Sequence, residues 1–185
     1  MSFARVRALV VIGVLAVAAI VFVVVALVRD SQGGLTASGG CPAGAPLANV
    51  TLPDDPDQVK VKIYNGTSQA GLADKVTNDF KNRGFTMQKP GVSKKKFDRI
   101  AIITYGPKAV GDAQLLKAYF LGKARPQYVA KRTSDVVDIV IGAEYQQLAT
   151  STEVNQSLVE LGEPEVPPGA CAAPAEKAVK TADAN

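Results

Sequence analysis

The chain has 185 residues and a net charge of +4, and it contains no histidine and no tryptophan. The lack of histidine excludes histidine general bases, Ser–His and Cys–His nucleophile pairs and imidazole metal ligands. The two cysteines, Cys41 and Cys171, stand far apart in the chain, which excludes a Cys-x-x-Cys redox or zinc motif. These absences count against an enzyme, and we assign no catalytic residue, no cofactor and no metal site from the sequence.

Residues 8–28 form an apolar run without charged or strongly polar side chains. As a helix this run is long enough to span a hydrocarbon core of about 30 Å. Arg5 and Arg7 precede it, so the positive-inside rule predicts that residues 1–7 are cytoplasmic and that the rest lies outside the cell membrane. A cleaved secretory signal is the alternative, although its apolar region is usually shorter, about 7–15 residues.

A linker rich in glycine, proline, alanine and aspartate is expected over residues 29–58. Cys41 lies in this linker, and Cys171 follows the last regular pattern of the chain. Because the space outside the membrane permits disulfides, we expect a Cys41–Cys171 bond that joins the two flanks of the domain. Two free exposed thiols are the alternative.

The first half of the domain reads as strand, helix and strand. Residues 59–64 alternate apolar and polar side chains, which predicts a strand. The following turn predicts an N-cap at Thr67 or Ser68, and the buried stripe of the next helix is Leu72, Val76 and Phe80. Gly84 suits the end of that helix, and Phe85 with Met87 begins a short strand.

The second half repeats this order and adds a strand. Residues 99–105 are apolar on both faces, which predicts an interior strand, and Gly106-Pro107 turns the chain into a second helix. The inward positions of this helix are Ala109, Ala113, Leu116 and Phe120, with Gly122 closing it. Strands are expected at 127–131 and 136–141, followed by a last helix with Leu148, Val154, Leu158 and Leu161 inward.

These elements predict an α/β domain over residues 59–161. Its small mixed sheet is built from two β-α-β units, in the order β-α-β-β-α-β-β, and a C-terminal helix follows. The helices are expected on one side of the sheet. Residues 162–185 are rich in alanine, proline and lysine and are expected to be a disordered tail.

The turn after the first strand is the sharpest local motif. Gly66 is expected to permit a tight turn, and Gly71 to permit close packing of helix on strand. Free amides beside Asn65 and Thr67, at a helix start, are able to hold an anion. The same residues also suit an ordinary strand-to-helix turn, and the Gly-Lys-Ser/Thr ending of a phosphate loop is missing.

Charge is distributed unevenly along the chain. Residues 59–144 hold 16 basic and 7 acidic side chains, a balance of +9, whereas residues 31–58 and 145–185 together hold 2 basic and 9 acidic, a balance of −7. Such asymmetry bears on partners rather than on fold. The candidate contacts for lipid headgroups or an anionic wall polymer are Lys94, Lys95 and Lys96, with a second cluster of Lys123, Arg125, Lys131 and Arg132. An ordinary solvated surface is the alternative, and nucleic acid is not expected outside the cell.

A series of motifs resembles the LytR C-terminal domain, which is appended to many LytR-CpsA-Psr wall-polymer transferases. The motifs are Val-x-Ile-Tyr-Asn-Gly-Thr-x-x-x-Gly-Leu-Ala at 61–73, Arg-Gly-Phe at 83–85, Ile-x-Thr-Tyr-Gly at 102–106 and Val-Asp-Ile-Val-Ile-Gly-Ala-Glu-Tyr at 137–145. The overall layout is similar to the Cei family of actinobacterial envelope integrity proteins, which keep this domain without the transferase domain.

This resemblance implies a non-catalytic, membrane-anchored module outside the cell that supports envelope integrity. It would bind or scaffold wall polymer, a wall precursor or a wall-assembly protein. The alternative from another class is an envelope enzyme, a wall-polymer transferase or hydrolase that works without histidine chemistry.

Overall fold

The computed structural model describes residues 41–174 together with residues 13, 15, 16 and 19. The chain divides into two units, residues 1–40 and residues 41–185, and only the second is described over most of its length. The transmembrane helix expected at 8–28 therefore lies almost entirely outside the described residues. Within the described part, no helix is long and apolar enough to cross a membrane.

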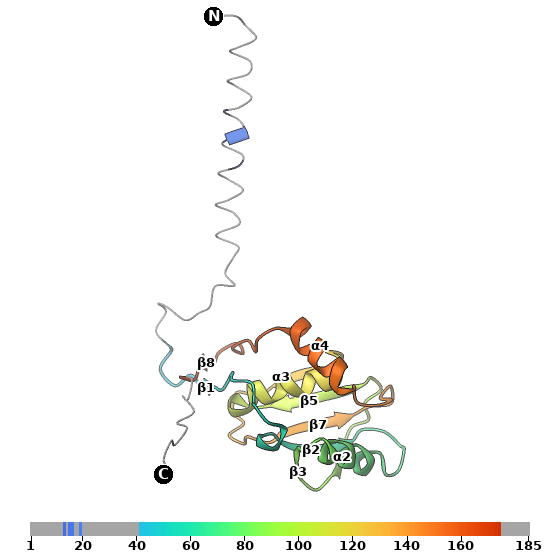
Figure 1. Cartoon of the computed structure of the whole chain (residues 1–185). Helices are drawn as coiled ribbons and strands as arrows, with labels where there is room; N and C mark the ends of the chain where they lie inside the picture. The colour runs from blue at the N-terminus through green and yellow to red at the C-terminus, as the bar shows by residue number, and fades with distance from the viewer. Residues whose placement is uncertain (1–12, 14, 17–18, 20–40, 175–185) are drawn as a thin grey trace, which may run out of the picture. The chain divides into compact units, whose positions relative to one another are not determined.

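The second unit is built on a mixed sheet of six strands (Figure 1). Its order is β3 (Thr86–Met87), β2 (Lys60–Asn65), β7 (Val137–Ile141), β5 (Ala101–Tyr105) and β6 (Arg125–Tyr128), and β4 (Gly91–Val92) also pairs with β2. Only the β5–β7 pair is antiparallel. The predicted mixed sheet is thus confirmed, and β5 is an interior strand as expected.

Alternation along the strands divides the sheet into a buried face and an open face. Val61 and Ile63 of β2 are fully buried, whereas Lys62 and Tyr64 between them are partly exposed. Ile139 of β7 pairs in register with Ile63 and Ile103, so the three side chains share the buried face. This shared face is the floor of the hydrophobic core.

The buried face is covered by α2 (Leu72–Asn82) and α3 (Val110–Tyr119), and α4 (Ser151–Leu161) follows later in the chain. The stripe of α2, with Val76 and Phe80, joins the same core cluster as Leu116 and Phe120 from the second helical segment. The third helix, α4, packs on the outer side of α3 through Val154. It begins with a capping box between Thr150 and Glu153. The predicted placement of the helices on one side is confirmed.

Local details differ from the sequence prediction where long-range contacts decide them. The N-cap of α2 is Gly71, with a φ of 74°, rather than Thr67 or Ser68. Strand β6 begins at Arg125 instead of residue 127, because its pairing with β5 starts at Ile102. Leu148 is buried in the core but precedes α4.

Both flanks of the domain are partly ordered, which corrects the expectations for the linker and the tail. Two short strands, β1 (Leu47–Ala48) and β8 (Cys171–Ala172), pair in parallel, and the predicted Cys41–Cys171 disulfide is present beside them. Two 3₁₀ turns, η1 (Pro56–Gln58) and η2 (Pro107–Ala109), complete the fold. The prediction of a disordered tail is therefore wrong for residues 162–174, since pairing and the disulfide hold them.

The linker is tied to the helical layer by backbone contacts. The amide of Asn49 donates to the carbonyl of Pro107 over 2.8 Å, and the amide of Gly111 donates back to the carbonyl of Asn49 over 3.0 Å. A Cβ at Gly111 would overlap the backbone of Thr51. The glycine at the start of α3 thus lets the linker lie directly on the helix.

Candidate functional site

The Asn65–Gly71 turn is closed by its own hydrogen bonds. The Oδ1 atom of Asn65 accepts from the backbone N of Thr67 (2.9 Å) and from the Thr67 hydroxyl (2.8 Å). Its Nδ2 donates to the carbonyl of Gln69 (2.6 Å), and the Gln69 amide donates to the Thr67 hydroxyl (3.0 Å). The amides of Thr67 and Gln69 are therefore already used, so the turn is a rigid support rather than an open anion cradle.

The two glycines of this turn have roles opposite to those expected. Gly71 adopts a left-handed conformation and has open space where a Cβ would stand. At Gly66 a Cβ would meet the carbonyl oxygen of Ile141 at 2.7 Å and Val140 Cγ1 at 2.8 Å. Gly66 is thus required for close approach and Gly71 for the turn, because only Gly71 has a positive φ.

The predicted basic loop crosses one end of the sheet, and we call residues 93–99 the crossover loop. The Ser93 amide donates to the carbonyl of Asn65, and the Phe97 amide donates to the carbonyl of Gly66, each over 2.8 Å. The carbonyl of Phe97 accepts from the amide of Ala143 over 2.9 Å. The loop is thereby tied to the ends of both β2 and β7 on its way to β5.

A second glycine lies under this loop. A Cβ at Gly142 would fall 2.6 Å from Phe97 Cδ1 and would also overlap the carbonyl oxygen of Arg99. No role for Gly142 was predicted from the sequence. The available signal was a glycine placed directly after the last strand, in the same position that Gly66 occupies after the first.

The second predicted basic cluster is divided between the two ends of the sheet. Strands β5 and β6 are parallel, so Lys123 and Arg125, at the start of β6, lie at the same end of the sheet as the crossover loop. Lys131 and Arg132 follow β6 and lie at the opposite end. Arg132 is also engaged, since it bonds Asp138 Oδ2 over 2.9 Å and the carbonyl of Val136 over 2.9 Å.

The end of the sheet that carries the crossover loop is strongly positive, and we call it the basic end. Among the described residues, no ion pair engages its lysines and arginines. One of its cations, Arg99, was not among the basic contacts predicted from the sequence. Its acidic side chains include Asp98, Glu144 and Asp74 in the first turn of α2, and its exposed basic side chains include Lys94, Lys95, Lys96, Arg99, Lys123 and Arg125.

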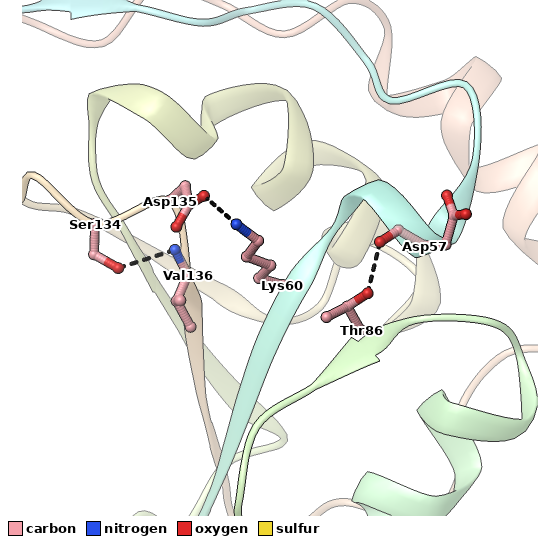
Figure 2. A network of polar contacts seen from close by, with 6 residues as sticks. All are labelled: Asp57, Lys60, Thr86, Ser134, Asp135 and Val136. Carbon is pink, nitrogen blue, oxygen red and sulfur yellow. Dashed lines mark hydrogen bonds and ion pairs between the residues drawn. The ribbon is translucent and has the colours of Figure 1, made fainter.

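A polar network lies at the opposite end of the sheet (Figure 2). Lys60 Nζ contacts Asp135 Oδ2 over 2.8 Å, and the hydrogen bond and charge of Asp135 raise the pKa of Lys60. The hydrogen bond from Lys60 in turn lowers the pKa of Asp135. The Thr86 hydroxyl donates to the carbonyl of Asp57 over 2.7 Å, which connects β3 to η1.

One carboxyl group near this network is shifted in the other direction. Burial, with a smaller contribution from the negative charge of Asp135, raises the pKa of Asp112 to about 6. Asp112 lies in the first turn of α3. Asp135, unlike Asp112, is held in an ion pair with Lys60. In the described part of the chain, no cluster of three potential metal ligands is found.

Comparison with known proteins confirms the resemblance. Residues 58–145 match the model of a family described as LytR cell envelope-related transcriptional attenuator. The crystal structure of the soluble domain of a conserved hypothetical secreted protein from Mycobacterium marinum has the same fold, with a TM-score of 0.52 and 21% identity over 62% of this chain and 82% of that one. No curated protein matches the chain.

Proposed function

Residues 58–145 belong to the LytR C-terminal domain family, and from this premise we propose that the chain supports cell envelope integrity as a non-catalytic domain outside the membrane. The run at 8–28 would anchor it in the cell membrane, with residues 1–7 in the cytoplasm. It would act by binding or scaffolding envelope material, namely wall polymer, a wall precursor or a wall-assembly protein. Two observations support a location outside the cell: the disulfide and the likeness in fold to a protein described as secreted.

The positive charge of the basic end is the observation that supports a role in binding. The crossover loop is fixed to two strands by backbone hydrogen bonds, yet Lys94, Lys95 and Lys96 are all exposed. Holding a charged loop rigid lowers the entropy cost of binding. Such a surface suits anionic envelope components, and the binding would weaken with added salt, because the screening length is about 8 Å at physiological ionic strength.

An envelope enzyme without histidine chemistry is the competing function. Asp112, with its raised pKa, is the described carboxyl that such chemistry would use first. An Asp112→Asn variant that restores envelope integrity fully in a deletion strain would argue against this alternative, whereas loss of function in a normally folded, normally exported variant would favour it.

Crosslinking in living cells tests the proposal. A photoreactive amino acid at position 95 in the basic end should capture a wall polymer, a wall precursor or an identified wall-assembly protein. The same group at position 131, exposed at the opposite end, is the matched control. Equal capture from both positions, or capture of no envelope component from position 95, would contradict a binding role for the basic end.

A further inference from the structure

The open face of the sheet offers a second surface beside the crossover loop. All three helices pack on the other face or outward from it. The strand registers bring together side chains from four neighbouring strands on the open face. These side chains are Lys62, Tyr64, Ile102, Thr104, Arg125, Gln127, Asp138 and Val140.

The side chains on this open face are apolar and aromatic at its centre and positively charged at its edges. Tyr64 lies beside Gly91, where a Cβ would stand only 3.0 Å from the ring, so the missing side chain leaves the ring room. Lys62 Nζ is 5.1 Å from the centre of the same ring. The one carboxylate on the face, Asp138, is paired with Arg132. The unpaired charge of the face is therefore positive.

The basic end lies away from the point where the chain enters and leaves the domain. The amide of Asn49, directly after β1, donates to the carbonyl of Pro107 in η2, which follows β5. Strand β8 pairs with β1 (Figure 1), and the disulfide begins the same segment. The crossover loop lies at the amino end of β5. The five residues of that strand separate the two ends by about 17 Å. Within the folded unit, the basic end is thus at the opposite end of the sheet from the β1–β8 pair and the Cys41–Cys171 disulfide.

We propose that the crossover loop and the open face together bind a linear anionic polysaccharide, rather than the headgroups of the membrane that anchors the chain. This inference rests on the proposed function and deepens it. Sugar rings have apolar C–H faces that pack on aromatic and aliphatic side chains, here Tyr64, Ile102 and Val140. Carboxylate or phosphate groups along the polymer would contact Lys94–Lys96, Lys62 and Arg125.

Lysine labelling separates the polymer from the membrane. The full-length protein is reconstituted in nanodiscs of neutral or anionic lipid, and the rate of amine acetylation is measured at each lysine by mass spectrometry. Polygalacturonate should slow the labelling of Lys94, Lys95 and Lys96 several-fold, and neutral dextran should not. Lys81, Lys108 and Lys131 are exposed at the opposite end and are internal controls. Slower labelling of the loop in anionic nanodiscs without polymer, or equal protection of all six lysines, would overturn the proposal.

Two variants test which part of the surface recognises the sugar. Lys94→Gln/Lys95→Gln/Lys96→Gln should weaken binding of polygalacturonate and of polyphosphate by roughly one to two orders of magnitude, as expected for three cations near an anionic surface. The matched control Lys81→Gln/Lys108→Gln/Lys131→Gln removes the same charge.

Tyr64→Leu keeps an apolar side chain and should weaken polygalacturonate binding several-fold while leaving polyphosphate binding unchanged. An equal effect of Tyr64→Leu on both polymers, or no effect on polygalacturonate, would contradict the role of the open face.

Failure of the polysaccharide proposal can be distinguished from failure of the proposed function. If position 95 captures a wall-assembly protein in cells while polygalacturonate protects no lysine, the polysaccharide proposal is wrong and the proposed function stands. If polygalacturonate binds as described but no envelope component is captured in cells, the proposed function fails instead.

Discussion

Replacing Gly142 by alanine should separate the crossover loop from the end of the sheet. The added Cβ would stand 2.6 Å from Phe97 Cδ1 and still closer to the carbonyl oxygen of Arg99, whereas ordinary contacts begin at 3.4 Å. Backbone must therefore move, and such overpacking costs about 1–3 kcal/mol. Two backbone hydrogen bonds, Gly142 N to Ile100 O and Ala143 N to Phe97 O, are each 2.9 Å long and would lengthen. Each contributes about 0.5–1.5 kcal/mol.

The total loss for Gly142→Ala should be about 2–4 kcal/mol in the free energy of unfolding. For a domain of this size the melting temperature falls by about 3–5 °C per kcal/mol, so a decrease near 10 °C is expected. Urea unfolding measures the free energy, and amide hydrogen exchange at Ala143 reports locally on the loop. Gly91→Ala is the matched control, because its Cβ would meet the ring of Tyr64 at 3.0 Å and a ring can rotate away. Its cost should stay below about 1 kcal/mol. Equal midpoints for Gly142→Ala and the wild type, or a larger loss for Gly91→Ala, would refute this reasoning.

Three further changes have defined outcomes. Because the pKa of Asp112 is raised, the folded protein binds more protons than the unfolded chain between about pH 4 and 6, and its stability falls as the pH rises through this window. The Asp112→Asn variant should remove that fall and stabilise the protein at pH 7 by about 1–2 kcal/mol. Urea unfolding across the pH range measures both effects. A Cys41→Ser/Cys171→Ser variant should lose up to about 5 kcal/mol yet keep its far-ultraviolet circular dichroism, and retention of wild-type stability would show that the bond contributes nothing. Thr150→Ala breaks the capping box of α4 and should cost about 1 kcal/mol in thermal unfolding, whereas Thr133→Ala, in an exposed loop, should change the melting temperature little.

The order and type of most elements follow from local patterns in the sequence. Alternation at 59–64 predicts β2, and the spacing of Leu72, Val76 and Phe80 predicts α2, because each pattern matches the period of one backbone conformation. Gly84 and Gly122 both have the positive φ that suits the residue after a helix. The disulfide also follows from the sequence, since the chain offers only two cysteines and both flank the domain.

Strand order and the composition of the candidate surface are properties of the tertiary structure. Strand β7 lies between β2 and β5, although it is the last of the three in the chain. This pairing brings Gly142 beneath Phe97 and explains why Gly66, rather than Gly71, is the glycine that close packing requires. Local propensity cannot predict such contacts, because they join segments that are far apart in sequence.

The same physical reason governs the basic residues. Arg125 is close to Lys131 and Arg132 in the sequence. An extended strand advances by about 3.3 Å per residue, however, so Arg125 lies at one end of β6 and the other two cations lie beyond its opposite end. The parallel pairing of β5 with β6 then joins Arg125 to the crossover loop, and the ion pair with Asp138 removes Arg132 from the free charge. The sequence by itself thus determined the elements, the disulfide and the excess of positive charge. Only the long-range strand pairing decided which of those charges share one surface.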